Sequence, residues 1–486
     1  MATPVLHRTE VDGVPVVWAP APGQFTAALV FRVGRADEQP IDGGVTHLVE
    51  HLAMVRVGQP RYDCNAFVDG SRTVFFASGT PADVTAFFDI VTRELGDLPL
   101  DRLDKERDIL HREQAGRDGS VVEAHRHLRY GMWGHGLMGQ PEVGLHTLNG
   151  SRIAGWAKFA FTAGNAAMWM TGEPPPDLRL HLAAGVARQA PTPQPIPDLT
   201  FPMIVDEVPG FGLGFELARE VGAGTFMSLF HRRLRQRLRL DEGLVYDVLG
   251  EYEPLDGKRA LALLGADCEP RHVDQVGAVA FEILDALRGG SVSDDELRDE
   301  VADLERGFDD PTAIAGLLDA TVTDELLGMP ARSPDDRLEE QRSTTASDIA
   351  RRADEARSSA ILLATMSAPP DGFRPFPRSS ASEIDGREIK PLLSLFGVGR
   401  RQRLVIGRRG VTLRSADGVR TTIRYEDCVM LEKPADDELV LWDRDGDRIY
   451  IPAIYWRGGG AVLAEIEAAI PERLVVREKF SHDLID

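Results

Sequence analysis

The first part of the chain alternates between strand-like and helix-like hydrophobic patterns. Strand-like runs occur at residues 14–18, 27–33 and 73–77, and residues 45–54 repeat apolar positions with the period of a helix. Further helical patterns follow from residue 81 onward. This order predicts a first α+β domain.

The second part repeats this order of patterns. Strand-like runs at 212–217 and 260–267 lie on either side of a helical pattern at 229–240, and amphipathic helices are expected at 273–287 and 294–308. The repetition predicts two similar α+β domains in tandem.

The last part of the chain contains short strand candidates and a single helix. This combination resembles a PH-like domain, that is, a small β-barrel followed by a C-terminal helix. The expected strands are 403–406, 410–414, 421–425, 438–443 and 447–451, and the expected helix is 460–470.

Two proline-rich stretches, 188–202 and 367–380, separate these parts, because proline lacks an N–H donor and restricts φ. The length of 486 residues also exceeds what a single hydrophobic core usually supports. We therefore predict domains at residues 1–190, 203–367 and 388–480.

Composition and charge exclude several classes of function. The formal net charge of -22 disfavours nonspecific binding to nucleic acid or to anionic membranes. Cys64, Cys268 and Cys428 are far apart and form no C-x-x-C pair, so neither a disulfide framework nor a thiolate zinc site is expected. The sequence shows no signal peptide and no membrane span, which predicts a cytoplasmic protein.

The predicted helix at 45–54 carries His47, Glu50 and His51 in the order H-x-x-E-H. The two histidines stand at i and i+4 and share a face, and Glu50 can reach the same point. Two imidazoles beside a carboxylate fit Zn²⁺ binding with a general base over the bound water. Chance alone would produce such a pentapeptide in roughly 2 of 100 comparable sequences, so the motif needs support from elsewhere in the chain.

A catalytic zinc site usually has three protein ligands, so one more must come from outside the motif. The candidates downstream are Glu106, Glu113, Glu123, His125 and His127.

Three segments, GGVTHLVEHLAM, CNAFVDGSRTVFFASG and LDKERDILHREQ, resemble the pitrilysin/insulinase family of inverzincin zinc metallopeptidases, which includes the mitochondrial processing peptidases. The resemblance covers most of residues 10–365 and implies a single half with two peptidase-type domains. The family's E-R-x-x-x-x-x-E pattern implies Glu113 as the third ligand and Glu106 as a residue that supports the ligands. The spacing from His51 to Glu113 is shorter than is usual in the family, which leaves Glu123 as a competing ligand.

The same resemblance implies residues that bind substrate. The family's Asn-Ala-aromatic stretch corresponds to Asn65, Ala66 and Phe67, and it implies that the following strand, 73–77, is the sheet edge to which an extended peptide adds.

The segment LRLDEGLVYDV in the second part resembles another element of the family. It implies that Arg239 holds the substrate and that Tyr246 donates a hydrogen bond to the oxyanion. Without the resemblance, a solvated arginine and a core tyrosine would be the simpler interpretation.

The resemblance implies a zinc-dependent endopeptidase that cleaves unfolded peptides or leader segments inside a closed chamber, with Glu50 as general base. It further implies a homodimer, or a heterodimer with a related chain. One alternative is a weakly active or inactive partner or scaffold subunit, and another is an enzyme dedicated to one leader.

The stretch 400–424 is rich in arginine within an acidic chain. An anionic partner or a lipid head group could bind there, although solvated arginines on both strand faces are the simpler interpretation. The arginines are at positions 400, 401, 403, 408, 409, 414, 420 and 424.

Overall fold

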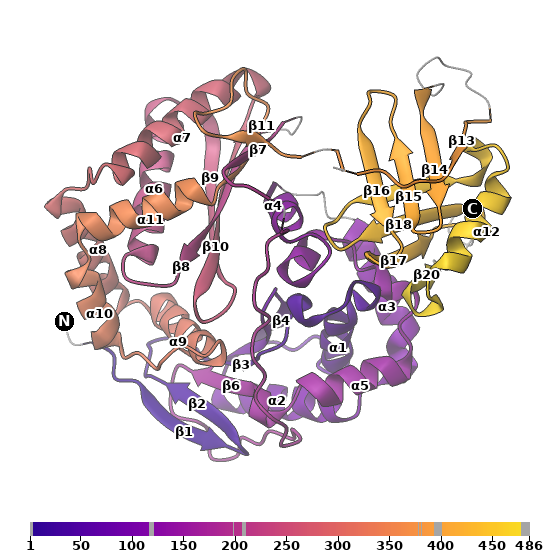
Figure 1. Cartoon of the computed structure of the whole chain (residues 1–486). Helices are drawn as coiled ribbons and strands as arrows, with labels where there is room; N and C mark the ends of the chain where they lie inside the picture. Colours follow the sequence, from indigo (N-terminus) through magenta and orange to yellow (C-terminus); the bar gives the residue numbers. More distant parts are fainter. Residues whose placement is uncertain are drawn as a thin grey trace.

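The structure is a computed structural model that describes residues 3–115, 121–197, 199–206, 210–377, 379–380, 382–392 and 401–477. It has a mixed α+β architecture, as expected, with its sheets in three successive regions of the chain (Figure 1). Within the described residues, none of the helices combines the length and the apolar character needed to span a bilayer.

The first region is built on a six-stranded sheet with the order β1-β2-β6-β3-β5-β4. Helices α1 (Val45–Met54), α2 (Pro81–Gly96) and α5 (Gly150–Ala160) pack together over one face, and α3 (Leu103–Ala115) lies against α1. The strands are β1 (His7–Val11), β2 (Val14–Trp18), β3 (Phe25–Phe31), β4 (Asp63–Val68), β5 (Thr73–Gly79) and β6 (Ala166–Met170).

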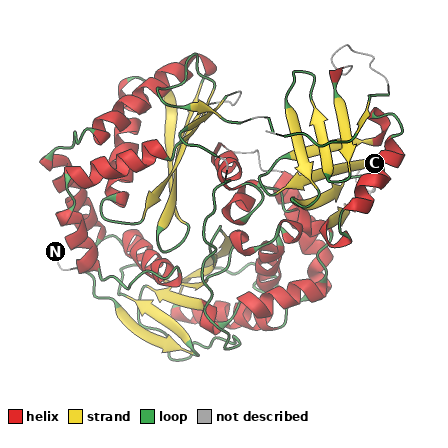
Figure 2. Ribbon diagram, in the orientation of Figure 1, coloured by secondary structure: helices red, strands yellow, loops and turns green. Residues whose placement is uncertain are grey.

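The second region has a sheet with the order β12-β7-β11-β8-β10-β9. Its helices α6 (Ala223–Arg235), α7 (Val273–Arg288) and α11 (Ala346–Ser358) cover one face, on the outer side of the molecule in Figure 2. Helices α8 (Asp294–Gly307) and α10 (Pro334–Ser343) contact each other beside them. The strands are β7 (Met203–Val205), β8 (Phe211–Ala218), β9 (Val245–Pro254), β10 (Arg259–Cys268), β11 (Ile361–Ala364) and β12 (Arg374–Pro375).

The two sheets share one topology, which agrees with the predicted tandem similarity. Five strands correspond in order and direction, with β4-β5-β3-β6-β2 matching β9-β10-β8-β11-β7. In each sheet four of these five strands pair antiparallel and the last pairs parallel to its neighbour. Only the outermost strand differs, since β1 pairs antiparallel and β12 pairs parallel.

Each of these regions contributes a helix to the sheet of the other. Helix α9 (Pro311–Leu326) of the second region packs Ile314, Leu318 and Val322 on the open face of the first sheet. Helix α4 (Val121–Tyr130) of the first region contacts β8, β10 and β11 of the second and lies between the two regions in Figure 1. The two regions are therefore joined through buried surfaces.

The third region contains two four-stranded sheets, so the expectation of a closed barrel was wrong. Among the described residues no strand pairing joins the sheet β13-β14-β15-β16 to the sheet β19-β18-β17-β20, because β17, which the sequence reading missed, pairs with β18 and the short β20. Helix α12 (Gly459–Ala469) packs on their common core. The strands are β13 (Arg387–Ile389), β14 (Arg403–Gly407), β15 (Gly410–Arg414), β16 (Arg420–Arg424), β17 (Cys428–Lys433), β18 (Glu438–Asp443), β19 (Arg448–Pro452) and β20 (Val475–Arg477).

Three of the seven described arginines of 400–424 pair with acids on the same region. Arg403 pairs with Glu388 at 2.9 Å, Arg409 with Glu426 at 3.2 Å, and Arg414 with Glu383. Arg400 lies outside the described residues. These pairs favour the simpler interpretation of a solvated, internally compensated surface.

The sheet edge beside the predicted motif is β4 and not 73–77. Strand β5, which contains 73–77, lies between β3 and β4, so it has hydrogen-bonded neighbours on both sides. Strand β4 (Asp63–Val68) is short, and its exposed positions hold Phe67 beside Asp63 and Asn65, so the polar–apolar alternation of a half-buried strand is broken there, which hid its strand character. The prediction of 73–77 as the edge was therefore wrong by one strand.

Candidate metal centre

Helix α1 presents the predicted motif at its partly buried side. It begins after Gly44, whose φ of 95° suits glycine, and it buries Leu48, Val49 and Leu52 in the core of the first region. The side chains of His47 and His51 remain 12% and 16% exposed. The apolar side thus fixes the helix while the histidines reach solvent.

The N-terminus of α1 is held by a residue that the sequence reading missed. The Glu38 carboxylate accepts hydrogen bonds from the backbone N–H groups of Gly44 at 2.9 Å and Thr46 at 2.8 Å. A carboxylate at this position satisfies free N–H groups of the first turn. Glu38 therefore caps the helix that carries the motif.

The Nε2 atoms of both histidines face the carboxylate of Glu113 on α3. Glu113 Oε2 lies 3.9 Å from His47 Nε2, and Glu113 Oε1 lies 3.7 Å from His51 Nε2. Ligand bonds of 2.0–2.2 Å in a tetrahedron place ligand atoms about 3.3–3.6 Å apart, so a zinc ion would fit after a small inward movement. The structure therefore places the Glu113 carboxylate beside both histidines.

The Glu50 carboxylate lies beside the same two histidines. Its Oε2 is 3.6 Å from His47 Nε2, and Glu50, His47 and His51 each place a potential ligand atom within 4.8 Å of the others. Glu50 is buried, which restricts its carboxylate to the space next to the imidazoles. A carboxylate there can act as a ligand or as a base.

The second nitrogen of each imidazole also has a carboxylate partner. Glu106 Oε2 lies 3.5 Å from His51 Nδ1, and both carboxylate oxygens of Glu142 lie 3.1 Å from His47 Nδ1. Metal-binding histidines typically donate their other N–H to such a group, which fixes the tautomer and the ring orientation. Glu106 was expected here, whereas Glu142 was missed because its loop has no periodic pattern that could reveal it.

Burial and charge shift the pKa values of the cluster. Burial raises the pKa of Glu50 to about 7, against the opposing charge of His47. Burial would lower the pKa of His47, but the hydrogen bond and the charge of Glu142 outweigh it, so this pKa is raised. Burial and the charge of His47 lower the pKa of His51. A dication between these groups would favour their ligating protonation states.

The cluster lines a hollow of about 360 Å³ next to the free edge of β4. Asn65, Ala66 and Phe67 of β4 also line it, so the predicted metal-binding and substrate-binding residues share one cavity. Glu123 and Arg35 complete part of the wall. Glu123 thus lies on the wall of the same hollow as the predicted ligands.

The two other candidate ligands are placed elsewhere. His125 is buried against Gly214 of β8, and burial lowers its pKa to about 3. The ring of His127 lies against Gly446 of the third region. Both histidines are packing residues at contacts between regions.

Arg239 and Tyr246 lie together on the second region. Arg239 Nη1 is 3.2 Å from Asp247 Oδ1, and its guanidinium carbon is 5.4 Å from the centre of the Tyr246 ring. Tyr246 is 83% exposed, so it is no core residue. Neither belongs to the described residues that line the hollow around His47, so this structure does not bring them to the motif.

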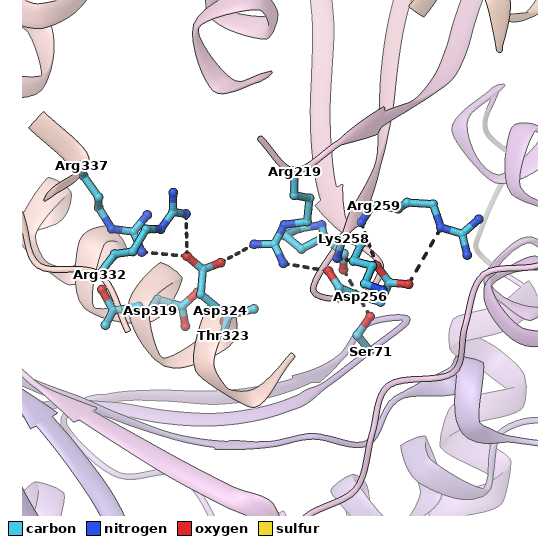
Figure 3. Close-up of polar contacts among 12 residues, drawn as sticks. Ser71, Arg219, Asp256, Lys258, Arg259, Asp319, Thr323, Asp324, Arg332 and Arg337 are labelled. Carbon is cyan, nitrogen blue, oxygen red and sulfur yellow. Dashed lines mark hydrogen bonds and ion pairs between the residues drawn. The ribbon is translucent and has the colours of Figure 1, made fainter. Parts of the chain in front are cut away.

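A larger cavity of about 690 Å³ lies where the first two regions meet, and Met138 lines both this cavity and the motif hollow. At its centre Asp324 pairs with Arg219, with Arg332 at 3.2 Å and with Arg337 at 2.8 Å (Figure 3). From the first region, Ser71 donates hydrogen bonds to the backbone of the second, beside this network in Figure 3. A network of paired charged and polar side chains therefore forms part of the cavity wall.

Comparisons with known proteins support the family resemblance. The family model described as the Peptidase M16 inactive domain matches residues 210–304, within the second region. No curated protein sequence matches the chain.

Solved structures share the fold at low sequence identity. A protease from Helicobacter pylori is 16% identical with a TM-score of 0.59, over 75% of this chain and 100% of that one. An M16 inactive domain structure from Pseudomonas fluorescens is 15% identical with a TM-score of 0.59, over 75% and 100%. Pitrilysin is 14% identical with a TM-score of 0.55, over 75% of this chain and 45% of its own. The first two regions thus have the fold of M16 peptidases, and the matches support a likeness to the pitrilysin/insulinase family.

Proposed function

We propose that this chain is a zinc-dependent endopeptidase. The observation that carries the proposal is the convergence of His47 Nε2, His51 Nε2 and the Glu113 carboxylate at 3.7–3.9 Å. The carboxylates behind both imidazoles add support, because ligands held from the far side are typical of metal sites. The M16 peptidase fold agrees with this chemistry.

The residues of the site have separate roles. His47, His51 and Glu113 would hold the zinc ion, which supplies Lewis acidity toward a peptide carbonyl and toward water. Glu50 would accept the proton of the attacking water and pass it to the leaving amine.

The substrate is proposed to be an unfolded peptide or a leader segment. Among the described strands β4 lies at the end of its sheet, with β5 as its neighbour on one side, and its Asn65, Ala66 and Phe67 line the hollow. An extended peptide can add to such an edge through main-chain hydrogen bonds, which a folded protein cannot easily do. A closed chamber formed by a homodimer, or by a heterodimer with a related chain, remains a prediction, as does a cytoplasmic location.

The deciding experiment combines zinc content with peptide cleavage. The purified chain should contain one zinc ion and cleave members of a mixed library of unfolded peptides. Glu50→Gln should keep the zinc and lose cleavage, whereas His47→Ala should lose both. Normal turnover by Glu50→Gln would refute the proposed mechanism.

A partner or scaffold subunit is the second candidate. It is favoured by the position of Arg239 and Tyr246, which do not line the motif hollow and instead contact each other. In this case the chain would bind zinc yet cleave nothing from the library. Cleavage that appears only after a related chain is added would identify a subunit.

A further inference from the structure

The third region packs against the first close to the candidate metal centre. The contact is an apolar cluster whose members are buried, and strands β17 and β20 reach the short turns η2 (Pro40–Asp42) and η5 (Val143–His146). Its members are Ile41, Met132 and Val143 from the first region and Met430, Val440, Trp442 and Val476 from the third.

The turn between β18 and β19 reinforces this contact. The backbone N–H of Met132 donates to the carbonyl of Arg444 at 2.9 Å, and Arg444 lies 5.6 Å from the centre of the Trp133 ring. Gly131, with a φ of 65°, leaves no room for a Cβ beside the backbone of Arg444. This close approach of two backbones shows that the third region is seated on the segment after α4.

The first-region residues of this contact lie close in sequence to Glu142, which holds His47, and to helix α1, which carries it. Val143 directly follows Glu142, and Ile41 lies four residues before the start of α1. Glu142 is 4% exposed and holds His47 Nδ1 at 3.1 Å through both of its oxygens. A shift of η5 or η2 would therefore move the carboxylate relative to the imidazole.

The packing around Glu142 is tight enough to transmit such a shift. A Cβ at Gly44 would lie 2.9 Å from the Cβ of Glu142, so the start of α1 and Glu142 are in direct contact. Arg35 Nε lies 3.6 Å from the same carboxylate. Close-packed elements move together, because there is no free volume to absorb a displacement.

We propose that the third region is a built-in positioning element of the metal centre, with Met430 as a positioning residue that acts through Glu142. By packing on Ile41 and Val143, it holds the Glu142 carboxylate against His47 Nδ1. This inference rests on the proposed zinc site and assigns a role to the part of the chain that lies outside the two peptidase-type regions. Met430 is not among the residues that line the hollow around His47.

The test is a double-mutant cycle on zinc affinity in the full chain. Competition with a chromophoric chelator would give the zinc Kd of the wild type, Met430→Ala, Glu142→Gln and the double variant. Each single change should weaken binding about 10-fold, as for other residues that orient a ligand. The double variant should be no weaker than Glu142→Gln alone, because both changes remove one interaction.

Two variants separate positioning from general destabilisation. Ile466→Ala removes a comparably buried side chain from the core of the third region, away from the interface cluster, and should leave the zinc Kd unchanged. Val143→Ala trims the same contact from the first region and should reproduce Met430→Ala even if that variant folds poorly. Hydrogen exchange should quicken at 41–46 and 131–146 in both contact variants.

The outcomes are distinct. Three results would overturn the inference while leaving the zinc site intact. They are a wild-type zinc Kd in both contact variants, a double variant whose loss of affinity is the product of the two single losses, and a loss of affinity in Ile466→Ala equal to that in the contact variants. A wild-type chain that binds no zinc would overturn the proposed function and this inference together. If the chain binds zinc but cleaves no peptide, only the proposed peptidase activity would be refuted, and the inference about zinc binding would stand.

Discussion

Glu106 Oε2 lies 3.5 Å from Nδ1 of His51, on the side of the ring opposite the nitrogen that faces Glu113. Glu142 holds His47 in the same way at 3.1 Å. Each histidine of the motif is therefore fixed from behind by one carboxylate. This pair of contacts fixes the orientation of both imidazole rings.

Removing the charge of Glu106 should weaken zinc binding. Glu106→Gln leaves a side chain of similar shape but a weaker acceptor for His51 Nδ1, so we expect the zinc Kd to rise about 10-fold. Competition with a chelator measures this change. Asp108→Asn, an exposed change on the same helix, should leave the Kd within error, and an equal effect of both would refute a specific role for Glu106.

The third ligand can be assigned by comparing two glutamates. Glu113 faces both Nε2 atoms, whereas Glu123 only shares the wall of the hollow. Glu113→Ala should abolish stoichiometric zinc binding, because a two-histidine site retains too few protein ligands. Glu123→Ala should bind zinc normally. Elemental analysis after dialysis gives both results, and the reverse pattern would reassign the ligand.

Tyr246 is expected to contribute to kcat without contributing to zinc binding. If the second region approaches the motif when substrate is bound, Tyr246→Phe should lower kcat by about 10²-fold or more through the lost oxyanion hydrogen bond, with unchanged zinc content. Steady-state kinetics on a cleaved library peptide measures this. Tyr455→Phe, on the third region, serves as the control. A wild-type kcat in Tyr246→Phe would exclude the tyrosine from catalysis.

Asp324 should stabilise the fold of the second region. Its carboxylate is buried among Arg219, Arg332 and Arg337, so Asp324→Ala should lower the free energy of unfolding by about 3 kcal/mol, the cost of leaving buried charges unpaired. Urea denaturation measures this loss, and Asp309→Ala, on an exposed turn, is the control.

The effect of Asp324 should depend on pH. Burial would raise its pKa, but the charges of Arg219 and Arg337 outweigh burial and lower it. A lowered pKa stabilises the fold above the unfolded-state value of about 3.9 and loses that contribution as pH falls toward the folded-state value. The difference between wild type and Asp324→Ala should therefore shrink below about pH 4. A constant difference across this range would contradict the ion-pair explanation.

The contribution of Glu38 to stability should depend on pH in the opposite direction from that of Asp324. Burial raises its pKa to about 7, although the charge of Arg35 opposes this. The wild type should then lose stability as pH rises from the unfolded-state pKa of about 4.3 to 7, relative to Glu38→Gln, which does not titrate. The gap in unfolding free energy should change by roughly 3 kcal/mol. Urea denaturation of metal-free protein at pH 5 and 7.5 tests this, and an unchanged gap would disprove it.

The sequence by itself determined the motif and most of the regular elements. The helix at 45–54 follows from its apolar period, and that period places His47, Glu50 and His51 on one side, because helix geometry is local. Likewise 14–18, 410–414 and 438–443 are strands with the expected bounds. The periodic pattern misplaced the helix predicted for 229–240, because helix α6 begins at residue 223 and a π-helix continues it over Gln236–Asp241.

Only the tertiary structure decided which residues complete the site. Glu142 reaches His47 across 95 positions of sequence, and Glu38 caps α1 from an irregular segment. The edge position of β4 and the seating of the third region on Val143 likewise depend on how separate elements pack. Such contacts leave no periodic signal, because they are set by the shapes of surfaces that meet only when the whole chain has folded.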